Sequence, residues 1–298
     1  MNKIIYLVLL FSLFSCKKKE DDTTPAGTTA YQLDYPAYFG KNQNTPEDNP
    51  LTNEGVQLGR FLFYDTILSK DFTVSCASCH IQEHAFSDPN RLSEGVDGQL
   101  GNRQAMAIVN LLWQRDFFWD GRANSLEVQA LLPIENPVEM NLSIDEAVKR
   151  LNNSEFYLPK FQKAFAIEAI SKEHLAKAIS QFERTLISGN SKYDQYKRNE
   201  YTLTASEERG LNLFFTHPEP SISLRGGNCN DCHSGFLTTD NELHNNGLDA
   251  NHDTDKGREE FTNYPSDRGE FKTVSLRNIA VSSPYMHDGR FNLSLIHI

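Results

Sequence analysis

The sequence is poor in positive charge, in long apolar runs and in β-strand patterns, and each shortage argues against a class of protein. Its 29 lysine and arginine residues stand against 40 aspartate and glutamate residues, a formal net charge of −11. Such an acidic chain is unsuited to nucleic acid and favours a basic partner. The apolar run over residues 4–14 is short for a membrane span. No segment shows sustained alternation of apolar and polar residues, so a nearly all-α fold is predicted.

Cysteine is also scarce, and four of the five cysteines lie in two copies of one motif. Both copies, 76–80 and 229–233, read C-x-x-C-H, in which two thiols bind the vinyl groups of a c-type haem and the histidine ligates its iron. A redox disulfide requires no histidine after each copy. A zinc site usually has its ligand pairs closer together. Two haem c groups are therefore favoured over these alternatives, with the attachment residues Cys76, Cys79, His80, Cys229, Cys232 and His233.

The fifth cysteine, Cys16, belongs to a leader. Residues 1–16 have a charged start, a short apolar run and the sequence LFSC, which resembles the lipobox of bacterial lipoproteins. An ordinary secretory signal with an incidental cysteine is the alternative. Either signal predicts export, and the lipobox predicts a lipid anchor at Cys16 in the periplasm or cell envelope. Residues 17–35 are expected to form a flexible tether, because their first part is polar and rich in threonine.

A pattern repeated before each haem motif predicts a duplicated cytochrome unit. Gly59 and Phe63 lie four residues apart in one expected helix. Gly210 and Phe214 repeat this spacing in a second helix, which opens at a capping box over 204–207. In cytochrome c domains, a glycine at this place permits close helix crossing, and an aromatic ring four residues later packs nearby.

The rest of the chain is predicted to be helices joined by long loops. Apolar residues recur at spacings of three and four, as in amphipathic core helices. Helices are expected over 54–63 and from about 143, 171 and 204, with long loops over 88–102 and 237–267. We therefore predict an all-α fold of two cytochrome c-like haem domains with long irregular loops, over 36–200 and 201–298. One large domain is also compatible with the length.

Four further segments resemble the bacterial di-haem cytochrome c peroxidase family, which includes MauG-type enzymes that oxidise tryptophans of a partner protein. They are FWDGR (118–122), PIENPVEM (133–140), FERTL (182–186) and PYMHDG (284–289). The resemblance covers nearly everything after the tether. It implies that the N-terminal haem reacts with peroxide and that the C-terminal haem receives electrons.

The resemblance also implies roles for three side chains. Trp119 matches a tryptophan between the two haems that assists electron transfer, and Gln129 matches a distal glutamine that can hydrogen-bond peroxide. Glu139 matches a distal glutamate, and peroxide chemistry needs a group that moves a proton between the two oxygens. From the residues alone, Trp119 could instead be a core ring, and Glu139 could belong to a turn and helix start.

One position departs from the family pattern. Many members have a distal histidine that caps the peroxidatic iron until the other haem is reduced, and its place falls at Val96. Because valine cannot ligate iron, we expect a five-coordinate N-terminal haem that is active without reductive release. His84 is expected to line the proximal side of that haem or to hydrogen-bond locally.

The second iron and a calcium ion complete the expected metal sites. In the family, a methionine or tyrosine in a helix after the His-Asp-Gly segment is the sixth iron ligand. That helix is missing from this sequence, so we expect a truncated C-terminal domain with Met286 as the fallback ligand. The resemblance implies a calcium ion between the domains, bound by the carbonyls of Thr273 and Ser275 and by the side chain of Gln104, where the family has asparagine.

These features together predict a cytochrome-c peroxidase. It would reduce hydrogen peroxide to water with electrons from a small c-type cytochrome or copper protein, and a homodimer is a candidate assembly. MauG-like oxidation of a partner protein is one alternative. A non-enzymatic di-haem electron carrier is the other.

Overall fold

The structure is a computed structural model that describes residues 24–41 and 43–293. The predicted signal peptide, its Cys16 and the first part of the tether lie outside the described residues. Within the described ranges, none of the helices is long and apolar enough to cross a membrane. Helices dominate, as the sequence predicts, and there is little sheet.

The α-helices are α1 (Asn53–Tyr64), α2 (Cys76–Cys79), α3 (Leu126–Glu135), α4 (Ile144–Asn152), α5 (Tyr157–Phe165), α6 (Lys172–Arg184), α7 (Lys192–Lys197), α8 (Ala205–Phe215) and α9 (Glu259–Thr262). Short 3-10 helices cover Ala37–Phe39, Thr66–Leu68, Gln82–His84, Val96–Gly98, Leu111–Trp113, Pro220–Ile222, Cys229–Asp231 and Pro265–Asp267. Two short strands, β1 (Leu243–His244) and β2 (Phe271–Lys272), pair antiparallel with Leu243 opposite Lys272.

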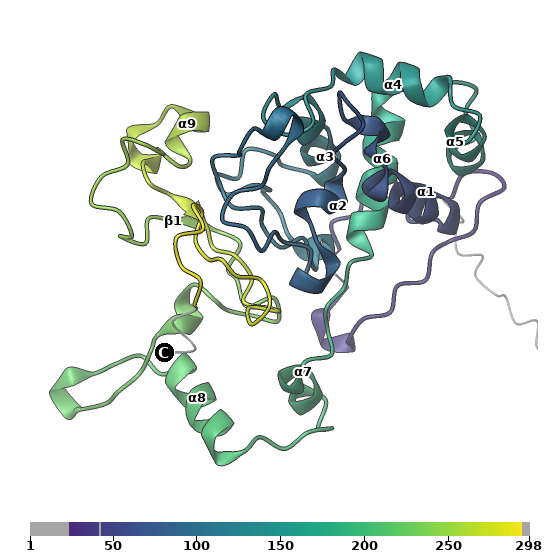
Figure 1. Ribbon diagram of the computed structural model, residues 1–298. Helices are drawn as coiled ribbons and strands as arrows, with labels where there is room; N and C mark the ends of the chain where they lie inside the picture. Colours follow the sequence, from purple (N-terminus) through teal and green to yellow (C-terminus); the bar gives the residue numbers. More distant parts are fainter. Residues whose placement is uncertain (1–23, 42, 294–298) are drawn as a thin grey trace, which may run out of the picture.

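The small sheet differs from the prediction of a nearly all-α chain. Its strands have only two residues each, which is too short to give an alternating pattern in the sequence. The expected loop over 237–267 also contains β1 and α9. Figure 1 shows α1 to α6 gathered in one half of the molecule and α8, α9 and β1 in the other, with α7 on the connection between them.

The helix starts agree with the capping residues read from the sequence. The Thr204 hydroxyl accepts a hydrogen bond from the Glu207 amide at 3.3 Å, and the Glu207 carboxylate accepts one from the Thr204 amide at 2.8 Å. At α4, the Ser143 hydroxyl accepts from the Glu146 amide. Each bond satisfies an N–H that has no partner within its helix, so these starts are fixed locally.

The core of the first half depends on a close crossing of α1 and α6. At Gly59, an added Cβ would lie 1.9 Å from the Ala178 carbonyl oxygen, so only glycine allows the two backbones this close. Leu58, Leu62 and Phe63 on α1 are almost completely buried around this point. Gly59 therefore has the role that the sequence predicts.

The corresponding glycine of the second half has no such neighbour. An added Cβ at Gly210 would meet nothing within 4 Å, and none of the described residues of α8 is buried. The repeated sequence pattern thus predicts helix α8 correctly, but the close crossing at Gly210 is not present in the described part of the chain.

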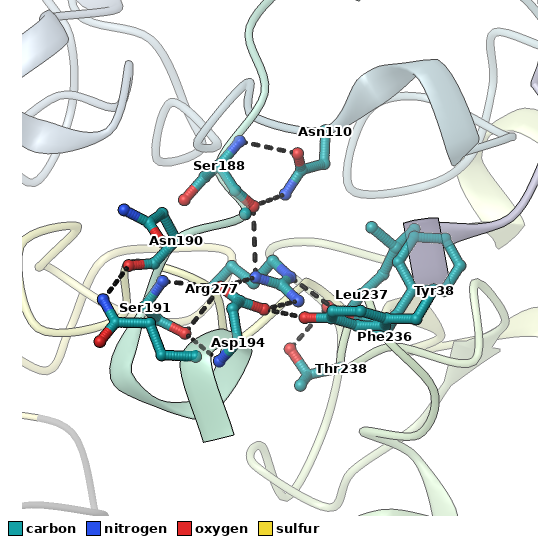
Figure 2. A network of polar contacts seen from close by, with 12 residues as sticks. Tyr38, Asn110, Ser188, Asn190, Ser191, Asp194, Phe236, Leu237, Thr238 and Arg277 are labelled. Atoms are coloured by element: carbon teal, nitrogen blue, oxygen red, sulfur yellow. Dashed lines mark hydrogen bonds and ion pairs between the residues drawn. The ribbon is translucent and has the colours of Figure 1, made fainter. Parts of the chain in front are cut away.

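A buried ionic network connects the two halves. The Asp194 carboxylate on α7 accepts two hydrogen bonds from Arg277, at 2.8 and 2.9 Å, and one from the Tyr38 hydroxyl. Burial opposes ionisation, but the hydrogen bonds, led by those from Arg277, lower the pKa of Asp194 to about 2. Arg277 also donates to the carbonyls of Ser188 and Phe236. Figure 2 shows that the network joins segments from the start, middle and end of the chain.

The crossing predicts opposite effects for two matched substitutions. Gly59→Ala places a methyl group against the Ala178 carbonyl and should cost about 1–3 kcal/mol of unfolding free energy. Gly210→Ala meets no neighbour and should be neutral or stabilising by up to about 1 kcal/mol, because alanine is the better helix former. Denaturant unfolding of the haem-loaded protein measures both. Equal stability of the two variants would contradict this account of the crossing.

Candidate functional site

The first haem motif holds its histidine in one orientation. Cys76 and Cys79 are the ends of α2, and His80 follows as its C-cap. The His80 Nδ1 lies 2.8 Å from the Phe86 carbonyl oxygen. A carbonyl can only accept, so Nδ1 carries the proton and Nε2 keeps a free lone pair. Burial lowers the pKa of His80, which favours the neutral imidazole that metals bind.

The second motif repeats this arrangement. The His233 Nδ1 lies 3.2 Å from the Thr238 carbonyl oxygen, and burial lowers the pKa of His233. Thr238 has φ of 54°, and Phe86 has φ of 58°, so both acceptors lie in left-handed turns that fold the chain back to the imidazole. Because neither residue is glycine, each turn costs about 1–2 kcal/mol. Two strained turns that orient two histidines alike fit two haem groups.

A cavity of about 470 Å³ lies beside the first motif, within the size range of cofactor pockets. Cys79 and His80 line it, so a large planar group would have space beside the imidazole. The three side chains implied by the family, Trp119, Gln129 and Glu139, line the same cavity. Residues from separate parts of the sequence thus meet beside His80, and the site fits a haem attached at this motif.

Glu139 lies in a turn that follows α3, not at the start of a helix. The Asn136 side chain donates a hydrogen bond to its Oε1 at 2.6 Å. Burial raises the pKa of Glu139, while the Asn136 bond and the charge of Arg122 act against that rise. Its carboxyl group is therefore set to exchange a proton closer to neutral pH than an exposed glutamate. Gln129 approaches the cavity from α3 itself.

Val96 is not among the residues that line the cavity. Its side chain is 1% exposed and packs in the core with Ile134 and Met140. Its backbone N–H donates to the Glu139 carbonyl at 2.8 Å. Gly95 lines the cavity instead, and a Cβ there would lie 2.2 Å from the Val138 carbonyl oxygen. This loop therefore supports the Glu139 turn and presents no ligating side chain to the cavity from position 96.

Trp119 is buried, lines the cavity and contacts residues 271–287, which are called the C-terminal segment below. Its Nε1 donates to the Gln104 carbonyl at 2.8 Å, and its own carbonyl accepts from the Lys272 amide at 2.7 Å. His287 meets its ring edge-on at 6.5 Å and stacks on Phe271 at 3.7 Å. His287 thus packs beside Trp119 at the edge of the site.

The weaker predictions have mixed outcomes. The His84 Nδ1 lies 3.2 Å from the carbonyl oxygen of Val281, 197 residues away, so the predicted local hydrogen bond is wrong, and a place on the proximal side of the haem stays a prediction. Met286 lies half-buried with its sulfur 3.9 Å from the Asn246 amide nitrogen, and its role as ligand stays a prediction. The Gln104 side chain donates to the Asp88 carbonyl.

The other calcium candidates also have protein partners. The Thr273 carbonyl accepts from the Thr239 hydroxyl at 2.5 Å, and the Ser275 hydroxyl donates to the Leu237 carbonyl. These contacts leave the calcium ion a prediction. Sequence reasoning missed the cationic side chains that line the cavity, Arg103, Arg122 and Lys272. Lys272 lies directly before one predicted calcium ligand, but its residue type alone gave no sign of burial.

Comparison with known proteins assigns the chain to a family. The family model for di-haem cytochrome c peroxidase matches residues 53–202. The methylamine utilization protein MauG of Methylorubrum extorquens is 39% identical over 247 residues, which cover 82% of this chain and 67% of that relative. The cytochrome c551 peroxidase of Nitrosomonas europaea is 33% identical over 249 residues, with 82% and 70% coverage.

A solved structure supports the same assignment. The crystal structure of a MauG-like protein associated with microbial copper homeostasis is 35% identical, with a TM-score of 0.80, and the match covers 89% of this chain and 80% of that one. Sequence, fold and the two oriented histidines therefore agree, and the chain belongs to the di-haem cytochrome c peroxidase family.

Proposed function

We propose that the chain is a cytochrome-c peroxidase that reduces hydrogen peroxide to water at the N-terminal haem. The observation that carries this proposal is the cavity beside His80, which Glu139 and Gln129 both line. Relatives named cytochrome c peroxidase in Nitrosomonas europaea and Escherichia coli are 33% and 32% identical to this chain. A non-enzymatic electron carrier would not need an acid with a raised pKa in this cavity.

The residues of the cavity supply proton transfer and orientation. When bound, the haem supplies an iron with an open coordination position and the electrons for peroxide reduction. The carboxyl of Glu139 takes a proton from one peroxide oxygen and returns it to the oxygen that leaves as water. Asn136 holds the other carboxyl oxygen, and Gln129 orients peroxide. The overall reaction consumes two electrons and two protons for each peroxide and yields two waters.

In this proposal, a second haem would supply the electrons. Cys229, Cys232 and His233 hold it in a C-terminal domain over 201–298, and the peroxidatic domain covers 36–200. Trp119 assists the transfer between the two sites, where its backbone contacts the C-terminal segment. The donor is a small c-type cytochrome or copper protein, and the net charge of −11 favours a basic one.

The location and the remaining ligands belong to the same proposal. Export with a lipid anchor at Cys16 places the enzyme in the periplasm or cell envelope, where covalent haem is assembled. A calcium ion bound through Gln104, Thr273 and Ser275 would join the two domains. Two copies of the chain are proposed to form a homodimer.

MauG-like oxidation of a partner protein is the second candidate. Two observations favour it: the 39% identity to a MauG protein, and a valine where many peroxidases have a capping histidine. Oxidation of a partner protein without an added electron donor would distinguish this candidate from the peroxidase.

The ferric resting protein should contain one high-spin and one low-spin haem. Val96 cannot ligate iron, and its side chain packs in the core, so the N-terminal iron should have an open position. Electron paramagnetic resonance measures both signals. Two low-spin signals with no high-spin signal would show that another group caps the iron.

Glu139→Gln should lower the turnover of peroxide with reduced donor by about 10²–10⁴-fold, because glutamine cannot accept and return the proton. Haem absorbance should show that both haems remain. Glu135→Gln, at the exposed end of α3 and outside the cavity, is the matched control and should turn over like the unchanged protein. Full activity of Glu139→Gln would refute its role.

A further inference from the structure

Lys272 brings a buried positive charge from the C-terminal half of the chain to the N-terminal haem cavity. It lies on β2, is 4% exposed and lines the cavity beside His80. Its backbone N–H donates to the Trp119 carbonyl at 2.7 Å, which fixes the strand against the segment that precedes α3. Lysine is rarely buried unless a partner compensates its charge.

The contacts of Lys272 do not include a carboxylate. Its Nζ donates to the carbonyls of Arg115 and Asp116, the second at 2.8 Å, and lies 5.6 Å from the centre of the Phe117 ring. Within the described ranges, no carboxylate lies at ion-pair distance from this ammonium group. Burial is the largest effect on this group and lowers the pKa of Lys272 to about 8. The charge of Asp116 acts to raise the pKa, and the charge of Arg115 acts to lower it.

The other two cations of the cavity are already neutralised. Arg103 binds Asp120 at 2.6 Å and Asp255 at 2.7 Å, and Arg122 binds Asp120 at 2.9 Å. Lys272 is therefore the cation of the cavity wall that still lacks a counter-charge in the described part of the protein. A buried charge without a partner is costly, so its position indicates an anionic group in the cavity. A haem carries such groups, because its two propionates are carboxylates.

We propose that Lys272 is the cationic partner of a propionate of the N-terminal haem, and thereby raises the reduction potential of that haem. The proposal rests on the haem site of the proposed function but not on the peroxide reaction. A fixed positive charge stabilises the reduced iron relative to the oxidised iron, because the oxidised iron has one more positive charge. The C-terminal segment would thus complete the site of the N-terminal haem, next to Trp119.

Potentiometric titration of the two-haem protein, followed by absorbance and by the ferric spin signals of each haem, tests this proposal without an activity assay. Lys272→Gln removes the charge but keeps an N–H donor for the two carbonyls, and Lys272→Arg keeps the charge. Lys256→Met, an exposed lysine of the same half, is the control. Lys272→Gln should lower the potential of the N-terminal haem more than that of the C-terminal haem, while Lys272→Arg and Lys256→Met should leave both near their original values.

The possible outcomes separate charge from packing. An unchanged N-terminal potential in Lys272→Gln would overturn the proposal, and so would equal shifts in Lys272→Gln and Lys272→Arg. If Lys272→Gln fails to retain the N-terminal haem, retention of that haem at its original potential in Lys272→Arg supports the proposal, and loss in both variants overturns it. The reduction potentials do not depend on turnover. If the expected potential shifts were found in a protein that does not reduce peroxide, only the peroxidase proposal would be refuted.

Discussion

The hydrogen bond from His80 to the Phe86 carbonyl is the constraint on which the rest of the site depends. It fixes the proton on Nδ1, so Nε2 is available beside the cavity. Phe86 adopts a strained left-handed backbone conformation that places this carbonyl. Thr238 adopts the same strained conformation beside His233. Since local strain persists only where surrounding contacts hold it, both turns indicate that histidine orientation is what these loops provide.

The two halves of the molecule are interdependent at this site. Asp194 and Arg277 hold the C-terminal segment to the start and middle of the chain through buried hydrogen bonds. Removing one partner would leave a buried charge uncompensated, which costs about 3–5 kcal/mol. The same segment carries Lys272, whose backbone contacts Trp119 and whose side chain lines the N-terminal cavity. The second half of the molecule thus contains its own haem motif and also contributes Lys272 to the cavity of the first half.

Features with local causes could be predicted from the sequence. The capping residues Thr204 and Ser143 place their helix starts correctly, because each bond forms within one turn. The close helix crossing at Gly59 could also be predicted, because Gly59 and Phe63 lie four residues apart on one helix face. The convergence of Trp119 and Glu139 on His80 followed from the family resemblance, and spacing alone could not have given it.

Features that depend on distant contacts could not be predicted. The bond from His84 to Val281 joins residues 197 positions apart, and no pattern near either residue indicates the other. Lys272 and Asp194 are charged residues that sequence patterns place on the surface, and only tertiary contacts bury them. Gly210 shows the converse, because an identical local pattern lacks the packing found at Gly59.

The most direct test of the account is an anaerobic titration of the fully reduced protein with hydrogen peroxide, followed by the absorbance of both haems. Two ferrous haems hold two electrons, and reduction of one peroxide to two waters requires two. The account therefore predicts that one peroxide per protein oxidises both haems completely. Slow oxidation that needs several equivalents of peroxide, or an N-terminal haem that stays reduced, would contradict it.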